Sequence, residues 1–361
     1  MKKILALILS LLMVLSLVAC GGASAPAAPD APAVDAPAAD TPAEDPKVVI
    51  KWASSVSQAE IEGNSTPMAI AINTWIETVE EASNGSIEVE IYPGSTLANG
   101  TDETLTGLLT GSFEMAQLNT GSWGDYTDAF AALNVPYLYT DFSLVHAVMD
   151  SEFGAGMLEQ VKNDVNIQPL CYADIGYRHV TNSKGPIKTA ADMQGLKIRT
   201  MTDQVQIASF EDLGAAVTPM AISELFSALQ TKLVDAQENP LTTINSQKYY
   251  EVQGYCTLTK HSYTTTIFFM NVDFYNSLTE NQKAAVAAAN EAATQKSRAR
   301  LAEAEAETRV ILEEQGMEFY ELSAEEMKTF QDAVAPTWKT IEQSMGAEKW
   351  AELLATVEAA K

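Results

Sequence analysis

The chain has 361 residues, of which 48 are acidic and 22 are basic, so its formal net charge at pH 7 is −26. A surface this acidic repels phosphate backbones, and we therefore expect no nucleic acid as a partner. The same charge works against a basic face that binds a membrane surface. Any anion that this protein handles must be met by a local basic site within an unfavourable overall field.

The first twenty residues, MKKILALILSLLMVLSLVAC, contain two lysines, an apolar run and a Leu-Val-Ala-Cys ending. The apolar run is short for a transmembrane span, so this pattern predicts a secretion signal with a lipobox. Cys20 is then the lipidated N-terminus of the mature protein. An uncleaved anchor helix is the alternative. Both hypotheses place the bulk of the chain outside the cytoplasm, tethered to the cell membrane.

Residues 21–46 are almost all Ala, Pro, Asp and Gly, with no aromatic residue and no positive charge. Such a segment cannot bury a core, and we predict a disordered tether. Residues 47–361 exceed the usual size of a single core, so we expect two lobes.

Strands and helices alternate in the first part of the folded region. The pattern predicts a strand at 48–55, a helix that begins at Ser65 or Thr66 and ends before Gly85, a strand at 86–94, a helix near 101–111, a strand at 113–119 and helices through 141–163. This alternation is typical of an α/β fold with a mostly parallel sheet that is covered on both sides.

A second set of short alternating elements begins near residue 166. We predict strands at 166–183, 196–200, 215–219 and 233–239, with helices at 205–214 and 222–230 between them. Two further strands, at 252–260 and 264–272, carry the chain back across both lobes. Lobe 1 thus comprises about 47–165 plus part of 262–361, and lobe 2 about 166–261.

The segment 278–316 is rich in Ala, Glu, Lys and Arg and contains no proline. It predicts one helix of over thirty residues that ends at Gly316. A coiled coil is the alternative, but no apolar heptad is sustained, so we favour a helix that spans both lobes. A strand at 317–322 and two C-terminal helices complete the chain.

Cys171 and Cys256 remain once Cys20 is lipidated. They could pair outside the cytoplasm, although we favour two buried free thiols because no pattern brings them together. The three histidines lie far apart without the spacing of a metal site, so we predict neither a metal site nor a cofactor.

No arrangement typical of an enzyme is present. The sequence has no His-Glu-x-x-His, no Gly-x-Ser-x-Gly turn, no phosphate-binding Gly-x-x-x-x-Gly-Lys and no dinucleotide fingerprint after a strand. We therefore predict that the protein is not an enzyme, and an extracellular enzyme on a two-lobe scaffold stays the disfavoured alternative.

Arg199 is the strongest candidate for a binding residue. It ends the strand Leu-Lys-Ile just before TMTD, at the edge where open α/β sheets place ligand crevices. A guanidinium there can bind a carboxylate with two hydrogen bonds. The alternative is a structural arginine paired with an interior acid. Arg178 is a second such case, and Asn239, held extended by the following proline, can direct its amide at a ligand oxygen.

Four blocks of the sequence are informative together: GYRHVTNSKGPIKTAADMQGLKIR, LGAAVTPMAISELFSALQTKLVDAQENPL and KYYEVQGYCTLTKH, with NVPYLYTDFSLVHAVMD upstream. They resemble the substrate-binding proteins of tripartite ATP-independent periplasmic (TRAP) transporters, of the dicarboxylate-binding type. The resemblance runs from about Val48 to about Gln343. It implies two α/β lobes of the periplasmic-binding-protein type that close on one organic acid and deliver it to a membrane permease.

The resemblance also implies roles for individual residues. Arg199 corresponds to the arginine that forms the main salt bridge to the ligand carboxylate, Arg178 to a second contact, and Asn239 to an asparagine that binds ligand oxygens. By position, Asn119 should face the cleft, with Asn64 and Trp123 as further candidates.

The chain departs from the family pattern at several positions near these residues. Ile222 stands where many relatives have an aromatic wall, Thr200-Met201 replaces Val-Pro, and the segment 54–64 is longer than usual and lacks His-Pro. We expect small mono- or dicarboxylates as ligands, with sugar acids next. A lipid-anchored receptor that signals to a sensor protein stays an alternative to delivery.

Overall fold

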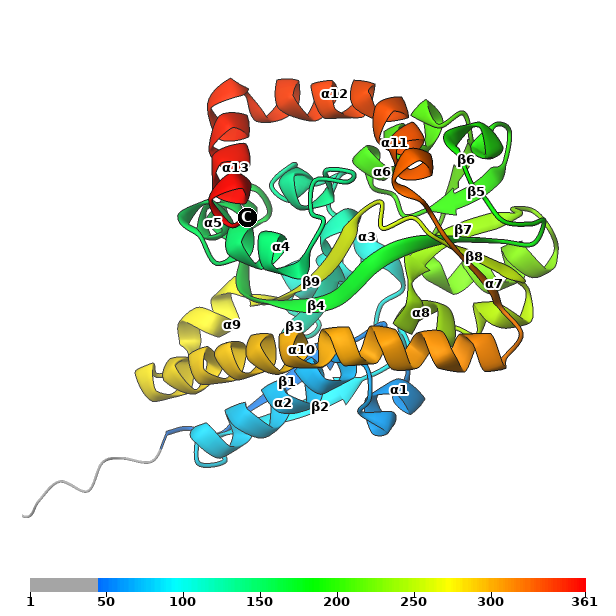
Figure 1. Ribbon diagram of the computed structural model, residues 1–361. Helices are drawn as coiled ribbons and strands as arrows, with labels where there is room; N and C mark the ends of the chain where they lie inside the picture. Colours follow the sequence, from blue (N-terminus) through cyan, green and yellow to red (C-terminus); the bar gives the residue numbers. More distant parts are fainter. Residues whose placement is uncertain (1–44) are drawn as a thin grey trace, which may run out of the picture. The chain divides into compact units, whose positions relative to one another are not determined.

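The computed structural model describes residues 45–361, whose strands form two sheets that share one long strand, β4 (Ile167–Asn182) (Figure 1). The predicted signal peptide, Cys20 and all but the last two residues of the predicted tether lie outside this range. Within it, no helix is both long enough and apolar enough to cross a membrane.

The first sheet has the strand order β2-β1-β3-β9-β4. β1 runs parallel to β2 and β3, whereas β9 runs antiparallel to β3 and to β4. Residues Ile167 to Tyr177 of β4 pair with β9 in this sheet. The strands are β1 (Val48–Ala53), β2 (Ile87–Tyr92), β3 (Met115–Asn119) and β9 (Tyr263–Asn271).

The second sheet continues from the other half of β4, in the order β4-β7-β5-β6. Residues Arg178 to Asn182 of β4 pair antiparallel with β7, and β5 runs parallel to β6 and β7. β8 pairs with β4 and β10 pairs with β8. The strands are β5 (Lys197–Thr200), β6 (Ala216–Pro219), β7 (Ala236–Pro240), β8 (Tyr255–Leu258) and β10 (Glu318–Glu321).

The α/β class is confirmed, and the sheets of the described residues are mixed: five of the nine strand pairs run parallel, and the four pairs that include β4 or β9 run antiparallel. The strands next to β4 are antiparallel to it in both sheets. The physical reason lies in the crossover: β4 carries the chain from the first sheet to the second, and β9 brings it back, so the two strands run in opposite directions.

Both faces of the first sheet are covered. On β9, Phe268 packs on one face with Trp52 and Trp75, while Phe269 packs on the other, as expected from the alternation of side chains along a strand. The helix α2 (Pro67–Ala82) covers the first face, and Thr66 caps it as predicted. The other face is covered by α3 (Gly100–Leu109), α4 (Phe142–Met149) and α5 (Glu152–Val165).

Helices also cover both faces of the second sheet. Phe210 of α6 packs with Ile198 of β5 in one apolar cluster. Leu225 and Leu229 of α7 pack with Ile244 of α8 in another. The helices are α6 (Gln204–Asp212), α7 (Ile222–Gln230) and α8 (Leu241–Ser246).

The predicted long helix is confirmed as α10 (Glu280–Glu314), which spans both sheets (Figure 1). Thr279 and Gln282 form a capping box at its start, and Gly316 follows its end with a φ of 90°. Its 35 residues correspond to a length of about 50 Å. Ala285 near its start is buried in the first sheet's cluster, and Leu312 near its end is buried in a cluster of the second.

Two local predictions need correction. The segment 54–64, in which no helix was predicted, contains a short helix, α1 (Gln58–Gly63), which Ser57 caps. The chain also ends in three helices and not two, because Gly346, with a φ of 81°, separates the last two. These are α11 (Ala324–Ala333), α12 (Ala335–Met345) and α13 (Ala347–Ala359).

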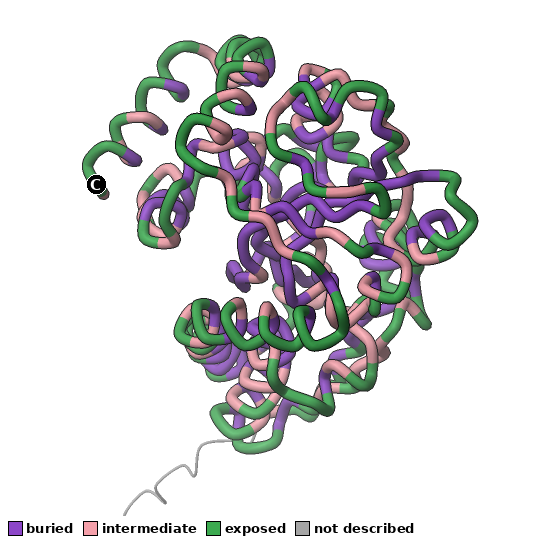
Figure 2. Tube along the Cα trace, turned by 45° about the vertical axis from the view of Figure 1, so that its right-hand side comes forward, coloured by how far each residue is buried: buried purple, intermediate pink, exposed green. Residues whose placement is uncertain are grey.

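Short elements connect the main ones. They are α9 (Val272–Ser277) and the 3₁₀ turns η1 (Thr120–Ser122), η2 (Ala131–Asn134), η3 (Ala190–Met193) and η4 (Tyr249–Glu251). Buried residues gather along the central strands, whereas α13 at the C-terminus buries residues on one side only (Figure 2).

The two cysteines of the folded region do not pair. Cys171 and Cys256 are both buried free thiols. The favoured hypothesis of two separate thiols is therefore confirmed.

Candidate functional site

Three neighbouring strands of the second sheet carry the main candidate residues. Arg178 lies on β4 opposite Pro240 of β7, and Arg199 lies on β5 opposite Gln237 of β7. Asn239 lies on β7 itself, between the two arginine strands. The three residues are 21 to 61 positions apart in the sequence. They lie on neighbouring strands because β7 pairs with both β4 and β5.

The guanidinium of Arg178 is fully buried and saturated with acceptors. Its Nε and Nη2 bind the carboxylate of Glu238, and Nη2 also donates to the Glu238 carbonyl at 2.6 Å. Nη2 further donates to Oδ1 of Asn239 at 3.0 Å, and Nη1 donates to Oγ1 of Thr264 at 2.9 Å. Arg178 is therefore neutralised inside the protein.

Glu238 also contacts His261, whose Nε2 lies 3.0 Å from its carboxylate. Burial by itself would raise the pKa of Glu238, but the charge of Arg178 and the hydrogen bond from His261 outweigh it and lower this pKa to about 2. Burial lowers the pKa of His261 despite the nearby acid. The network thus holds one positive and one negative charge at neutral pH.

Arg199 differs from Arg178 in its lack of an acidic partner. Only 2% of it is exposed, and its Nε and Nη2 both donate to the main-chain oxygen of Met220, at 3.0 and 2.7 Å. Its Nη1 is buried without any hydrogen-bond partner among the described residues. Burial lowers its pKa to about 10, so the guanidinium stays positively charged at neutral pH.

Tyr249 provides a second unsatisfied donor near this charge. Its ring is fully buried in η4, and its hydroxyl has no partner within residues 45–361. Burial raises its pKa to about 12, although the charges of Arg199 and Arg178 act in the opposite direction. A buried charge and a buried hydroxyl without acceptors each carry a free-energy cost that a bound anion would relieve.

The two asparagines that were predicted to face the cleft are already engaged within the protein. Asn239 accepts from Arg178 and donates from Nδ2 to Oε1 of Gln237 at 2.5 Å. Asn119 ends β3 and accepts from Oγ1 of Thr266 at 2.6 Å. Asn119 therefore belongs to the first sheet, and Asn239 to the second.

The two remaining candidates lie in other surroundings. Asn64 is exposed and ends α1 in a left-handed conformation, with its side-chain oxygen accepting from Asn73. Trp123 is fully buried in the apolar core of the first sheet, edge-on to Phe130 and Phe269. The structure does not bring either residue into contact with Arg199.

The segments that follow β3 and β5 touch each other across the space between the sheets. A Cβ atom on Gly121 would lie 2.5 Å from Cε of Met201 and 2.9 Å from Oδ2 of Asp203. A Cβ atom on Gly124 would similarly lie 3.5 Å from the main-chain nitrogen of Gln204. These distances show that the two segments lie against each other.

Asp203 is a buried acid at this contact that the sequence analysis did not single out. It is 4% exposed and caps α6, with Oδ1 accepting from the main-chain nitrogens of Val205 and Gln206 at 2.7 and 3.0 Å. Burial raises its pKa to about 7, although these main-chain hydrogen bonds act against that rise. Asp203 thus titrates near neutral pH.

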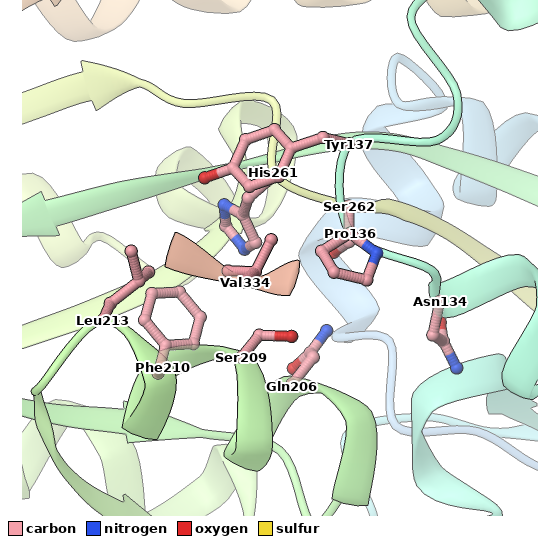
Figure 3. Close-up of a pocket in the computed structure, with 10 residues that line it drawn as sticks. All are labelled: Asn134, Pro136, Tyr137, Gln206, Ser209, Phe210, Leu213, His261, Ser262 and Val334. Atoms are coloured by element: carbon pink, nitrogen blue, oxygen red, sulfur yellow. The ribbon is translucent and has the colours of Figure 1, made fainter. Parts of the chain in front are cut away.

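A small cavity lies beside His261 (Figure 3). Gln206, Ser209 and Phe210 of α6 line one side of it, and Pro136 and His261 line the opposite side. Its volume of about 10 Å³ suffices for about one water molecule. It is therefore too small to hold an organic acid.

A larger cavity of about 240 Å³ lies beside Asp203, between η1, α6 and α12. Phe130, Val205 and Ile341 supply apolar surface. The polar part of the lining consists largely of hydroxyl groups and carboxylates, from Thr120, Thr127, Asp128, Asp203, Thr337 and Thr340 among others. The lining contains no lysine or arginine.

Sequence reasoning missed Glu238, His261 and Asp203. Glu238 directly precedes the candidate Asn239, and an acid inside a buried strand is itself a signal for a basic partner. His261 and Asp203 carried no such signal, because each lies in a loop whose burial depends on contacts between distant segments. Among the described residues, no cluster of His, Cys, Asp and Glu has the arrangement of a metal site.

Comparison with known proteins agrees with this geometry. The family described as bacterial extracellular solute-binding protein, family 7, matches residues 58–344. The chain belongs to this family. Family 7 proteins of this type are the extracytoplasmic binding proteins of TRAP transporters and are not enzymes, so the predicted resemblance and the predicted absence of enzyme function are confirmed.

The individual relatives include proteins named for different acids. The 2,3-diketo-L-gulonate-binding periplasmic protein of Escherichia coli is 32% identical over 224 residues, 62% of this chain and 68% of that protein. The sugar acid binding protein of Advenella mimigardefordensis, solved with galactonate, is 27% identical with a TM-score of 0.82, covering 88% of this chain and all of that chain.

A third relative was solved with a dicarboxylate. It is a TRAP periplasmic solute-binding protein of Sulfurospirillum deleyianum with bound succinate, 26% identical with a TM-score of 0.79, covering 88% of this chain and all of that chain. These structural neighbours confirm the predicted two-lobe α/β fold of the periplasmic-binding-protein type.

Proposed function

We propose that this protein is an extracytoplasmic, lipid-anchored receptor that binds one small organic acid between its lobes and delivers it to a TRAP-type secondary transporter. The observation that carries the proposal is the state of Arg199. Its charge is buried, its Nη1 has no partner, and no acid of the described residues forms an ion pair with it.

A carboxylate can accept the hydrogen bonds that the guanidinium of Arg199 does not make within the described residues. A guanidinium is planar and presents its donors in a fixed geometry that matches two carboxylate oxygens. The buried hydroxyl of Tyr249 would supply an additional donor. A neutral ligand of the same shape would leave the charge of Arg199 uncompensated, so the site selects against it.

Closure of the lobes would bury the bound acid. Contacts of Gly121 with Met201 and Asp203 support a closed state in which the segments after β3 and β5 meet. We propose lobe boundaries as predicted, at about 47–165 plus part of 262–361 and about 166–261. The change of pairing partner within β4, from β9 to β7 between Tyr177 and Arg178, supports a crossing between lobes in this strand.

Binding is tested by a thermal-shift screen of the purified protein against organic acids, sugar acids and amino acids, followed by calorimetric titration. A ligand at about 100 times its Kd should add about 2.7 kcal/mol of stability, which raises the Tm by several degrees. We expect a carboxylate hit that Arg199→Lys weakens at least tenfold. Arg309→Lys is the matched control, because Arg309 lies on α10 and pairs with the exposed Glu313.

Unchanged affinity in Arg199→Lys would refute the assignment of the site. An absence of any acid ligand, after unfolding and refolding to remove co-purified compounds, would refute the proposed receptor function.

Anchoring and delivery need separate tests, since Cys20 lies outside the described residues. Cells that express the protein with radiolabelled palmitate should incorporate label, and Cys20→Ser should abolish this incorporation while releasing the protein from membranes. Delivery is tested by uptake of the radiolabelled ligand into cells that contain the permease, with and without this protein. Normal binding without any uptake would favour the alternative receptor that signals to a sensor protein.

A further inference from the structure

Resting on the proposed function, we infer that the ligand is a monocarboxylic acid with hydroxyl groups and not a dicarboxylate. Arg199 holds its single carboxylate, and Asp203 accepts a hydrogen bond from a hydroxyl group at the other end. Asp203 is thereby a specificity-determining residue that excludes a second carboxylate.

The number of available buried cations limits the ligand to one carboxylate. Arg178 and Arg199 are the buried arginines among residues 45–361, and no lysine is buried there. Glu238 already neutralises Arg178, whose nitrogens all have acceptors. One positive charge remains, and it can compensate one carboxylate. A second carboxylate buried by closure would be left without a counter-charge, which is costly in a low-dielectric interior.

Asp203 adds a specific acceptor to this charge balance. It follows β5 at the same sheet edge as Arg199, and Gly121 closes over its Oδ2 from the other side. Oδ1 accepts hydrogen bonds from two main-chain nitrogens. Oδ2 accepts no hydrogen bond from the described residues and forms no ion pair with them. A ligand hydroxyl can donate to this oxygen, whereas a ligand carboxylate would be repelled by it.

The cavity beside Asp203, whose lining does not include Arg199, has a surface that suits hydroxyl groups. Thr120, Thr127 and Thr337 supply hydroxyl groups, Asp128 supplies another carboxylate, and the lining holds no basic side chain. Hydroxyl groups can both donate to and accept from such a surface. Its volume of about 240 Å³ gives room for a polar chain of several carbon atoms beside Asp203.

The first experiment compares matched acids by calorimetric titration of the purified protein at pH 8, where the carboxyl group of Asp203 is mostly ionised. The probes are aldonates of four and six carbons, the aldarates of the same configuration, and the corresponding uncharged alditols. We expect at least one aldonate to bind, its aldarate to bind at least 30-fold more weakly, and the alditol to give no heat.

The outcomes separate this inference from the proposed function. An aldarate, succinate or malate that binds as tightly as the best monocarboxylate would overturn the inference and leave carboxylate binding by Arg199 intact. A best ligand that is a monocarboxylate without hydroxyl groups would also overturn it. If no acid binds in this panel or in the wider screen, both proposals fail.

A variant tests the role of Asp203 directly. Asparagine caps helices as well as aspartate does, so Asp203→Asn removes the charge and keeps the cap of α6. We expect the preference for aldonate over aldarate to fall at least tenfold. Asp141→Asn is the matched control, because Asp141 is an exposed cap of α4. An unchanged preference in a folded Asp203→Asn protein would show that Asp203 does not set specificity.

Discussion

Glu238 binds the guanidinium of Arg178 through both of its carboxylate oxygens, and this pairing decides which arginine is available to a ligand. Arg178 and Arg199 are both buried, and their strands, β4 and β5, lie on either side of β7. Of the two, Arg178 alone forms an ion pair with an acid of the described residues. Arg199 keeps a buried positive charge without such a partner there, which is why we propose it as the residue that binds the ligand.

Replacement of Arg199 by an apolar residue of similar length should separate stability from function. Arg199→Met removes an uncompensated buried charge, so we expect the Tm of the ligand-free protein to be unchanged or raised by about 2–4 °C. The Tm increase caused by ligand should disappear. Differential scanning calorimetry with and without ligand measures both. A large loss of ligand-free stability would instead indicate a structural arginine.

The pair of Arg178 and Glu238 should behave as a coupled unit. Glu238→Leu leaves a buried guanidinium without its acid, which should cost about 3–5 kcal/mol of unfolding free energy. Replacing both partners, as Arg178→Met with Glu238→Leu, should recover at least half of that loss, because no uncompensated charge remains. Urea denaturation of the two single variants and the double variant checks this. Additive losses would show that the pair is not coupled.

Asp203 should make stability fall with rising pH. Its pKa is about 7 in the folded protein and about 4 when unfolded, so the unfolded state loses its proton first. The contribution of Asp203 is therefore fully present below about pH 4 and is lost as pH rises through 7. Glu238, which acts on Asp203 together with Arg178, keeps its negative charge across this window because its pKa is about 2.

The measurement is the unfolding free energy of the wild type minus that of Asp203→Asn between pH 4 and pH 8. The difference cancels the opposite contribution of His261, whose pKa is lowered by burial. We expect the difference to decline with pH and to level off above about pH 8. A flat difference would contradict the raised pKa of Asp203.

Gly121 should be needed for closure. A Cβ atom at this position would lie 2.5 Å from Cε of Met201, so Gly121→Ala should hinder the contact between the two sides and weaken ligand binding by roughly tenfold. Met201→Ala in the same chain removes the nearest obstructing atom and leaves Oδ2 of Asp203 at 2.9 Å, so it should restore part of the affinity. Gly156→Ala serves as the control, because no atom lies within 4 Å of its added Cβ. Full affinity in Gly121→Ala would argue against this contact in the bound state.

The two thiols should be unreactive in the folded protein. Burial raises the pKa of Cys171 to about 12 and that of Cys256 further, so neither forms the nucleophilic thiolate near neutral pH. A thiol reagent such as Ellman's should react with both only after unfolding, and a reducing agent should leave the Tm unchanged. Absence of free thiols in the denatured protein would show a disulfide.

Local sequence signals determined where most of the helices and strands begin and end. Thr66 with Pro67 set the start of α2, and the proline-free segment that ends before Gly316 set the long helix α10. These features depend on neighbouring residues, so they can be read from the chain itself. The quoted blocks were also sufficient to recognise the family that residues 58–344 match.

Only the tertiary structure decided which candidate residues are available and which are already paired. Arg178 and Glu238 are 60 residues apart, and their ion pair exists because β4 and β7 are neighbours in the second sheet. Asp203 is a buried acid that lies against Gly121, which comes from the first sheet's side. Charge compensation and burial depend on distances between remote segments. The sequence determined which chemical groups the protein has, and the packing of its two sheets decided that Nη1 of Arg199 and Oδ2 of Asp203 have no hydrogen-bond partner among the described residues.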